Sequence, residues 1–422
     1  MITCKKKEVP VSEVFPNYKW ATVVSSKEGL KGVPGITAKD CGTCHKEHYK
    51  EWKQSTHANA FTDLQFQSEL TKENSPKWLC LNCHIPVSGQ RKTLVTHLVD
   101  GKPLKSVETK NPNYIQNFEL EGVTCATCHL KTDSKGNPTI LGIHGYSAPH
   151  PVQKQTKNEL RSRCNDCHNI TYFLNDQLVC YFQTRDEMLK TPLASENCGS
   201  CHMKETKRSI ATGYPSRLSH RHYFPGSGVP KTFDLLKTSL ESGYDTGFQI
   251  RSAKILGEKL QLEVQNTNKA HKLPTGDPER NLKITIFFES SEGTILEKKQ
   301  ITIGQTWEWS PKAKLLQDNR LAPNEIRKLS LEFPKIPEIT KVQIITYHER
   351  LQKKTAEYMS KNASRAPEEF QKQISNLHEE YPFFRIIDWK ELDCKSGKIQ
   401  SKSRKQLLEE TLRAKNHLEG FE

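Results

Sequence analysis

Apolar residues are scarce in this chain. Only 34% of its 422 residues are hydrophobic, and the mean hydropathy is −0.72. The length is sufficient for two or three domains, but the first half is too polar to fold around side chains alone. Something other than side chains must therefore supply apolar volume in that half.

A nucleic-acid-binding pattern is also missing. The formal net charge of +14 would ordinarily suggest nucleic acid or an anionic membrane as a partner. However, no Arg-rich run is interleaved with aromatic residues, as a groove for single strands would require. We therefore do not expect nucleic acid as a partner.

Cysteine, in contrast, is plentiful and regularly placed. Ten of the 13 cysteines form five Cys-x-x-Cys-His motifs. In this motif two thiols add to the vinyl groups of a haem, and the adjacent imidazole binds its iron. We therefore predict five covalently bound haem c groups, attached through Cys41, Cys44, Cys80, Cys83, Cys125, Cys128, Cys164, Cys167, Cys198 and Cys201, with proximal iron ligands His45, His84, His129, His168 and His202.

Two other uses of paired cysteines explain the pattern less well. Two Cys-x-x-Cys pairs can complete a structural zinc site, but five pairs would leave one over, and zinc gives no reason for the His after every second Cys. A thioredoxin-like redox motif would occur once, at a strand-to-helix turn.

Five haems would also account for the composition. Each brings a large apolar macrocycle that can replace part of an ordinary core. The haem propionates would in turn balance much of the Lys and Arg surplus. We predict that residues 37–230 do not fold without haem.

The N-terminus carries a possible membrane tether. Residues 1–36 lack helical or alternating periodicity, so we predict an extended tether. Covalent haem attachment of this kind takes place outside the bacterial cytoplasm, yet no apolar export segment precedes Cys4. The sequence MITCKKK resembles the end of a lipoprotein signal, and we hypothesise that translation begins upstream and that Cys4 is lipidated. A stray cysteine at a frayed end and a true start at Met1 remain alternatives.

The predicted fold class is α+β and multidomain. Residues 37–230 form a mainly helix-and-loop pentahaem domain, in which Tyr49 and Trp52 follow the first motif at helical spacing. Residues 246–350 contain six alternating segments, which predict an antiparallel β-sandwich-like module. Residues 351–422 form a helical C-terminal extension, with helical patterns at 367–381 and 404–418.

The second axial ligand of each iron decides the chemistry. Two imidazoles close an iron for electron transfer, whereas one leaves a position open for a small molecule. His57 in Ser-Thr-His and His222 in SHRHYFPG are the strongest candidates. His97, His144 and His150 lie between motifs, and we take His97 and His144 as further candidates.

His271 lies in NTNKAHKLPTGDPER, a loop of the β region. It is either a surface or turn-stabilising residue, or an iron ligand on a loop that folds back over the haem domain. The second possibility would explain why a β module is joined to a cytochrome.

The residues CGTCHKEHYKEWKQSTHANA resemble the opening of the multihaem cytochrome c-552/c-554 family. Members run Cys-x-x-Cys-His, an aromatic residue, Trp and Ser-x-His, here Tyr49, Trp52, Ser55 and His57. The resemblance covers about residues 37–225 and implies closely packed, mostly bis-histidine haems in a periplasmic or cell-surface protein. It also implies that His57 serves a haem other than the one attached beside it.

The chain departs from two groups of relatives. The electron-carrier members have four motifs, and pentahaem nitrite reductases replace one motif His with Lys, whereas all five motifs here end in His. We therefore expect a periplasmic or outer-membrane cytochrome that relays electrons between a donor and an acceptor protein of unknown identity. The alternatives are reduction of a nitrogen oxide, hydroxylamine or peroxide at a five-coordinate haem, and a binding protein whose β module docks a partner.

Overall fold

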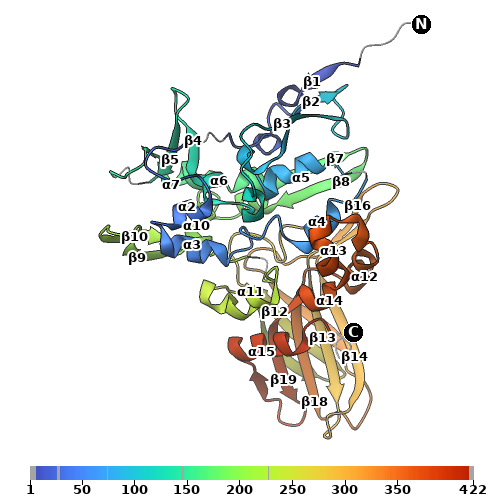
Figure 1. The fold of residues 1–422 in the computed structure, drawn as a ribbon. Helices are drawn as coiled ribbons and strands as arrows, with labels where there is room; N and C mark the ends of the chain where they lie inside the picture. Colours follow the sequence, from blue (N-terminus) through green and yellow to red (C-terminus); the bar gives the residue numbers. More distant parts are fainter. Residues whose placement is uncertain (1–5, 26–28, 74, 144–146, 227, 418–422) are drawn as a thin grey trace, which may run out of the picture. The chain divides into compact units, whose positions relative to one another are not determined.

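The computed structural model describes residues 6–25, 29–73, 75–143, 147–226 and 228–417 (Figure 1). The chain divides into two compact units that interleave along the sequence. Unit 1 comprises Met1–Cys167, Asn197–Phe224 and Lys361–Ser375, and unit 2 comprises His168–Glu196, Pro225–Ser360 and Asn376–Glu422.

Short helices carry the Cys-x-x-Cys-His motifs. Thr37 begins the first of them with a capping box, in which its side chain accepts from Asp40 N and the Asp40 carboxylate accepts from Thr37 N. One helical turn brings residues three apart onto one side, which suits the two thiols of a motif. The helices that contain or adjoin the motifs are α2 (Ala38–Gly42), α3 (Lys46–Lys53), α5 (Lys77–His84), α6 (Cys125–His129), α8 (Asn165–His168) and α10 (Gly199–His202).

Small sheets and further helices complete unit 1. The strands form an antiparallel sheet of β1 (Glu8–Pro10), β2 (Thr93–Val99) and β3 (Ser106–Lys110), a mixed sheet of β4 (Leu130–Thr132), β5 (Pro138–Gly142) and β6 (Val152–Lys154), and a hairpin of β9 (Glu205–Ser209) and β10 (Ser216–His220). The other helices are α1 (Val11–Val14), α4 (Leu64–Glu69), α7 (Lys157–Ser162) and α13 (Glu368–Ser375).

Two expectations for this part of the chain were wrong. The predicted N-terminal tether is structured from β1 onward, because Phe15, Trp20 and Leu30 are buried and a free tether would expose them. The helix-and-loop prediction missed the strands, which are short and alternate weakly. Cys4 lies outside the described residues.

Unit 2 is built mainly of antiparallel strands. A five-stranded sheet has the order β14-β13-β18-β19-β20, a three-stranded sheet has the order β11-β12-β17, and two hairpins pair β15 with β16 and β7 with β8. The strands are β7 (Asn169–Leu174), β8 (Gln177–Gln183), β11 (Phe248–Leu256), β12 (Lys259–Asn266), β13 (Asn281–Glu289), β14 (Ile295–Ile303), β15 (Gln305–Glu308), β16 (Lys314–Asp318), β17 (Ile326–Glu332), β18 (Lys341–Glu349), β19 (Phe384–Asp393) and β20 (Ile399–Ser401).

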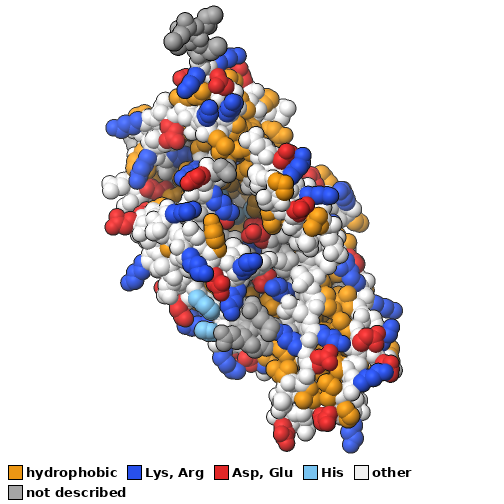
Figure 2. Space-filling view, turned by 90° about the vertical axis from the view of Figure 1, so that its right-hand side faces the viewer, with side chains coloured by type: hydrophobic (Ala, Val, Ile, Leu, Met, Phe, Trp, Pro, Cys, Tyr) orange, Lys and Arg blue, Asp and Glu red, His pale blue; other side chains and the backbone are white. Residues whose placement is uncertain are grey.

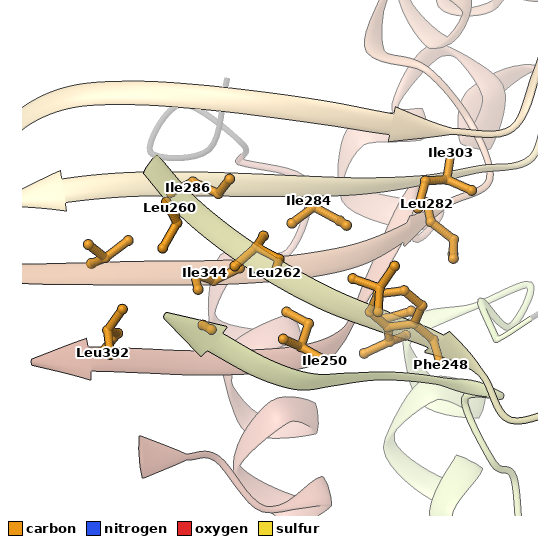
Figure 3. Packing of buried hydrophobic residues seen from close by; sticks show 14 of the residues in the cluster. Phe248, Ile250, Leu260, Leu262, Leu282, Ile284, Ile286, Ile303, Ile344 and Leu392 are labelled. Atoms are coloured by element: carbon orange, nitrogen blue, oxygen red, sulfur yellow. The ribbon is translucent and has the colours of Figure 1, made fainter. Parts of the chain in front are cut away.

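The core of unit 2 lies between its two larger sheets. Side chains of β11 and β12, such as Ile250 and Leu262, point toward those of β13, β18 and β19, such as Ile284, Ile344 and Leu392 (Figure 3). All are buried. This packing follows from period-two alternation, which directs one side of each strand toward the opposite sheet.

The C-terminal region is only partly the predicted helical extension. Its helices are α12 (Lys353–Lys361), α13, α14 (Leu377–Glu380) and α15 (Arg404–Ala414), and the last begins at Ser403 with a capping box. However, residues 384–393 form β19, which pairs with β18 in the five-stranded sheet. The prediction was therefore wrong for this stretch, while the α+β class is confirmed. Unit 2 also contains α9 (Thr184–Leu189) and α11 (Phe233–Thr238).

The surface is strongly charged and mixed in sign. On the side shown in Figure 2, Lys and Arg side chains are scattered among Asp and Glu side chains. None of the helices in the described part of the chain has both the length and the apolar character needed to cross a bilayer.

Candidate haem sites

Each attachment motif is arranged as a single helical turn. In the first and fifth motifs the backbone N–H of the His donates to the backbone carbonyl of the first Cys. The distance is 2.9 Å both from His45 to Cys41 and from His202 to Cys198. The ten motif thiols are free of disulfides. Among the described residues, no group of three or more His, Cys, Asp or Glu side chains could hold a bare metal ion.

Three motif imidazoles are oriented by backbone carbonyls. The Nδ1–H group donates to Ile210 O from His45 (2.6 Å), to Ala60 O from His84 (2.7 Å) and to Leu141 O from His129 (2.9 Å). A carbonyl only accepts, so Nδ1 carries the proton and Nε2 keeps its lone pair. This is the tautomer that an iron ligand needs, and the bond also fixes the ring.

Two of these imidazoles lie near a second imidazole from a distant part of the chain, and His48 lies closer, 5.9 Å from His45 and 4.9 Å from His222. The ring centroids of His45 and His150 are 6.4 Å apart, and those of His129 and His222 are 6.3 Å apart. A metal–nitrogen bond of about 2.0 Å places each ring centroid roughly 3.2 Å from the metal, so two axial imidazoles lie about 6.3 Å apart. The spacing of both pairs therefore fits a six-coordinate haem iron between the rings.

The protonation state of these rings also suits metal binding, which requires neutral imidazole. Burial lowers the pKa of His45 and His129, and it lowers the pKa of His222 well below its usual value. Nearby His48 and His129 lower the pKa of His222 further.

Comparisons with known proteins find similarity that includes the first three motifs. The family model described as "Cytochrome c554 and c-prime" matches residues 40–130. The chain is 22% identical over 164 residues to cytochrome c-554 of Nitrosomonas europaea. That match spans 35% of this chain and 63% of the relative's length.

Residues 40–130, which include the first three motifs, are thus similar to a multihaem cytochrome c family. The chain also shares its fold with the penta-haem cytochrome c552 of Thermochromatium tepidum, with a TM-score of 0.56 and 19% identity over 85% of this chain and 98% of the other. Together with the Cys-x-x-Cys-His motifs, the sequence matches support covalently bound haem c.

Four of the motifs lie close together in two pairs. The thiols of Cys41 and Cys125 are in hydrogen-bond contact, which joins the first and third motifs. The thiols of Cys164 and Cys198 join the fourth and fifth motifs in the same way. Haems attached at these sites would be neighbours.

The sequence did not predict that His150 would lie beside His45, because His150 was noted only as lying between two motifs. Gly32 fixes the loop of His150: its φ is +81°, and a Cβ atom there would collide with Pro149 O. Because the opposing ring is distant in sequence, only the flanking Pro149 and Pro151 hinted at a fixed loop. His222 remains a prediction as a ligand, and its ring centroid lies 6.3 Å from that of His129.

The remaining candidates are placed less decisively. The His57 ring contacts Phe224 with centroids 4.7 Å apart, and its carbonyl accepts from Val123 N, close to the third motif. His97 lies on β2 with Nδ1 3.0 Å from Thr96 Oγ1, and His144 lies outside the described residues. All three remain predictions as ligands.

The loop of His271 packs against the segment that follows the fourth motif, within unit 2. Glu187 on α9 accepts from Lys272 N (3.1 Å) and Thr275 Oγ1 (2.7 Å) and pairs with Arg320 (2.7 Å). The His271 ring contacts Asn268 Nδ2. Ligation by His271 remains a prediction, but the fold-back of its loop onto residues 168–196 is present.

Proposed function

We propose that this protein is a pentahaem cytochrome that relays electrons between redox partner proteins in the periplasm or at the cell surface. The observation that carries the proposal is the spacing between the imidazole rings of His45 and His150 and between those of His129 and His222, at the first and third motifs. Two axial imidazoles leave no position for a substrate, which favours electron transfer over catalysis at those sites.

The chain itself would hold and tune the haems. The motif cysteines would form two thioethers per haem, and the motif His would supply one axial nitrogen through Nε2. Bound haem supplies reversible one-electron chemistry. The carbonyls of Ile210, Ala60 and Leu141 would keep the imidazoles aligned and raise their basicity, which stabilises the oxidised state.

Contacts between motifs support a relay rather than isolated centres. Arg163 Nη1 donates to Cys128 O at 3.0 Å and so ties the third motif to the fourth. Together with the thiol contacts, this connects the first, third, fourth and fifth attachment sites in sequence.

The membrane tether is proposed from the sequence alone. Lipidated Cys4 would keep the relay at a membrane surface, where donor or acceptor proteins are concentrated. Mass spectrometry of the native N-terminus tests this, because an unmodified Met1 would exclude the lipid.

Electron paramagnetic resonance of the oxidised holoprotein tests the proposed function, together with a pyridine haemochrome count. We expect five haems per chain and low-spin signals that do not respond to nitrite, hydroxylamine or cyanide. A stoichiometric high-spin haem that binds these ligands would contradict the pure relay and favour the reductase alternative.

Single variants then test the assigned ligands. We expect His150→Ala and His222→Ala each to convert one low-spin haem to high spin, because each opens one axial position. His97→Ala tests the sequence prediction for that residue, and His417→Ala on the exposed end of unit 2 is the control. Unchanged spectra in His150→Ala and His222→Ala would show that the opposed rings are not ligands.

A further inference from the structure

Helix α3 is joined to the segment that carries His222 by a buried ion pair. Glu51 Oε1 and Oε2 accept from the two terminal nitrogens of Arg208, at 2.6 and 2.8 Å. Glu51 Oε2 also accepts from the backbone N–H of His222 at 2.8 Å, and Arg208 Nη2 donates to His220 O at 2.9 Å. One carboxylate and one guanidinium therefore hold the backbone on both sides of residue 221.

We propose that Glu51 and Arg208 are positioning residues that hold the His222 imidazole in its axial place. This inference rests on the proposed function, in which His222 is a ligand of the haem at the third motif. Neither residue touches the iron in this proposal. They act through the backbone of residues 220–222.

The burial of the pair supports a positioning role. The side chains of Arg208 and Glu51 are only 15% and 7% exposed. A buried ion pair gains little net stability, because desolvation of two charges offsets their attraction. A bidentate pair does fix geometry closely, since two parallel N–H···O bonds define both distance and plane. Its structural consequence here is the fixed path of the chain through His222.

Other contacts between α3 and the β9–β10 hairpin do not replace this pair. His48 Nε2 lies 2.9 Å from Ser219 Oγ, and His45 Nδ1–H donates to Ile210 O. Those bonds hold the hairpin beside the helix. Among the described residues, Glu51 is the side chain that bonds the backbone N–H of His222, while His222 Nδ1–H donates to His220 O and so orients the ring. Loss of the pair would therefore loosen both anchors of the ligand.

The first test is Glu51→Gln in the holoprotein. The amide can place its oxygen near His222 N only by turning its NH₂ group toward the donors of Arg208, so the bidentate pair is lost. We expect an increase on the order of tenfold in the fraction of molecules that bind cyanide, corresponding to the loss of one charge-assisted hydrogen bond. A high-spin ferric signal should accompany it. Glu47→Gln is the matched control, because Glu47 is an exposed carboxylate on the same helix.

A double variant separates positioning from electrostatics. Glu51→Gln leaves the Arg208 charge uncompensated, which should raise the midpoint potential of the nearby haem because a positive charge disfavours the ferric state. Glu51→Gln combined with Arg208→Gln removes both charges. We expect the potential to return toward the wild-type value while cyanide binding stays elevated. Recovery of cyanide resistance in the double variant would overturn the positioning role.

The remaining outcomes are also decisive. If Glu51→Gln does not mature, Arg208→Lys keeps the charge but loses the bidentate geometry, and it should show the same gain in cyanide binding. If Glu51→Gln and Arg208→Lys both keep wild-type spectra and resist cyanide, the inference is overturned. His222→Ala separates the ligand role of His222 from the positioning role of Glu51. If His222→Ala produces no high-spin haem, the ligand assignment fails. If it produces one and Glu51→Gln does not, only the positioning role fails.

Discussion

His348 is a buried histidine of unit 2 that is not among the candidate iron ligands. Burial and, to a smaller extent, the positive charges of Arg280, Arg350 and Arg385 together lower its pKa from 6.5 to about 3. Its Nε2 has no hydrogen-bond partner among the described residues. The ring is therefore neutral in the folded protein and gains a proton only when unit 2 unfolds.

This difference makes the stability of unit 2 dependent on pH. The unfolded state binds more protons below pH 6.5, so stability should fall as the pH drops toward 3, by up to about 1.4 kcal/mol per pH unit. We expect His348→Gln to have a shallower dependence between pH 7 and pH 4 in thermal unfolding followed by circular dichroism. His417→Gln is the control, and equal slopes in the two variants would contradict the role of His348.

The motif residues could be predicted from sequence because haem attachment is local: two thiols and one imidazole lie within five consecutive residues. The axial partners could not be predicted with the same certainty. His150 meets His45 only because the chain returns across the third motif and its sheet, and no spacing rule encodes that return. Glu51 and Arg208 were missed for the same reason, since a buried ion pair looks like surface charge in a sequence.

Among the elements, the segment that leads into the β sandwich is held mainly by hydrogen bonds from one buried side chain. Arg350, which follows β18, donates to Val229 O (2.6 Å), Pro230 O (2.8 Å) and Pro382 O (3.2 Å). Its guanidinium also lies 4.1 Å from the centroid of the Tyr381 ring. This buried side chain supplies donors to three carbonyls.

Arg350→Met should destabilise unit 2 by roughly 3 kcal/mol, because buried carbonyls would lose charged donors. Urea unfolding of the holoprotein measures this. Arg413→Met on the exposed side of α15 removes an equal charge and should change stability by less than about 0.5 kcal/mol. A loss in Arg350→Met no larger than that of the control would show that the fastening contributes little.

The elements that the sequence predicted are those with a repeated pattern. All six alternating segments between residues 246 and 350 are strands in the structure. Two kinds of strand were missed by the sequence prediction. β16 is exposed along most of its length and lacks an apolar side to alternate, while β19 opens with the continuous run Phe-Arg-Ile-Ile, which is buried in a central strand and gives no alternation.

At the scale of the molecule, we expect the two units to depend on haem to different extents. Unit 2 has a continuous aliphatic core between its sheets. Unit 1 shows a smaller cluster around Val87, Phe118 and Leu130, beside short helices. Haem macrocycles would supply the missing apolar volume there.

We therefore expect a full-length chain with its ten motif cysteines replaced by serine to be cleaved throughout residues 37–167 by a dilute protease. A fragment containing residues 246–350 should survive, with a cooperative β-type unfolding transition. The holoprotein is the control. Equal resistance of both regions in the haem-free chain would show that unit 1 folds without its haems.

Helix α13 has a consequence for how the protein is made. It belongs to unit 1 and packs on α4, with the rings of Phe61 and Phe370 6.4 Å apart, although it follows almost the whole sandwich in the chain. During vectorial synthesis the cytochrome unit therefore stays unfinished until residue 375 has emerged. A gene shortened after the fifth motif would encode every attachment site but would lack helix α13 of unit 1.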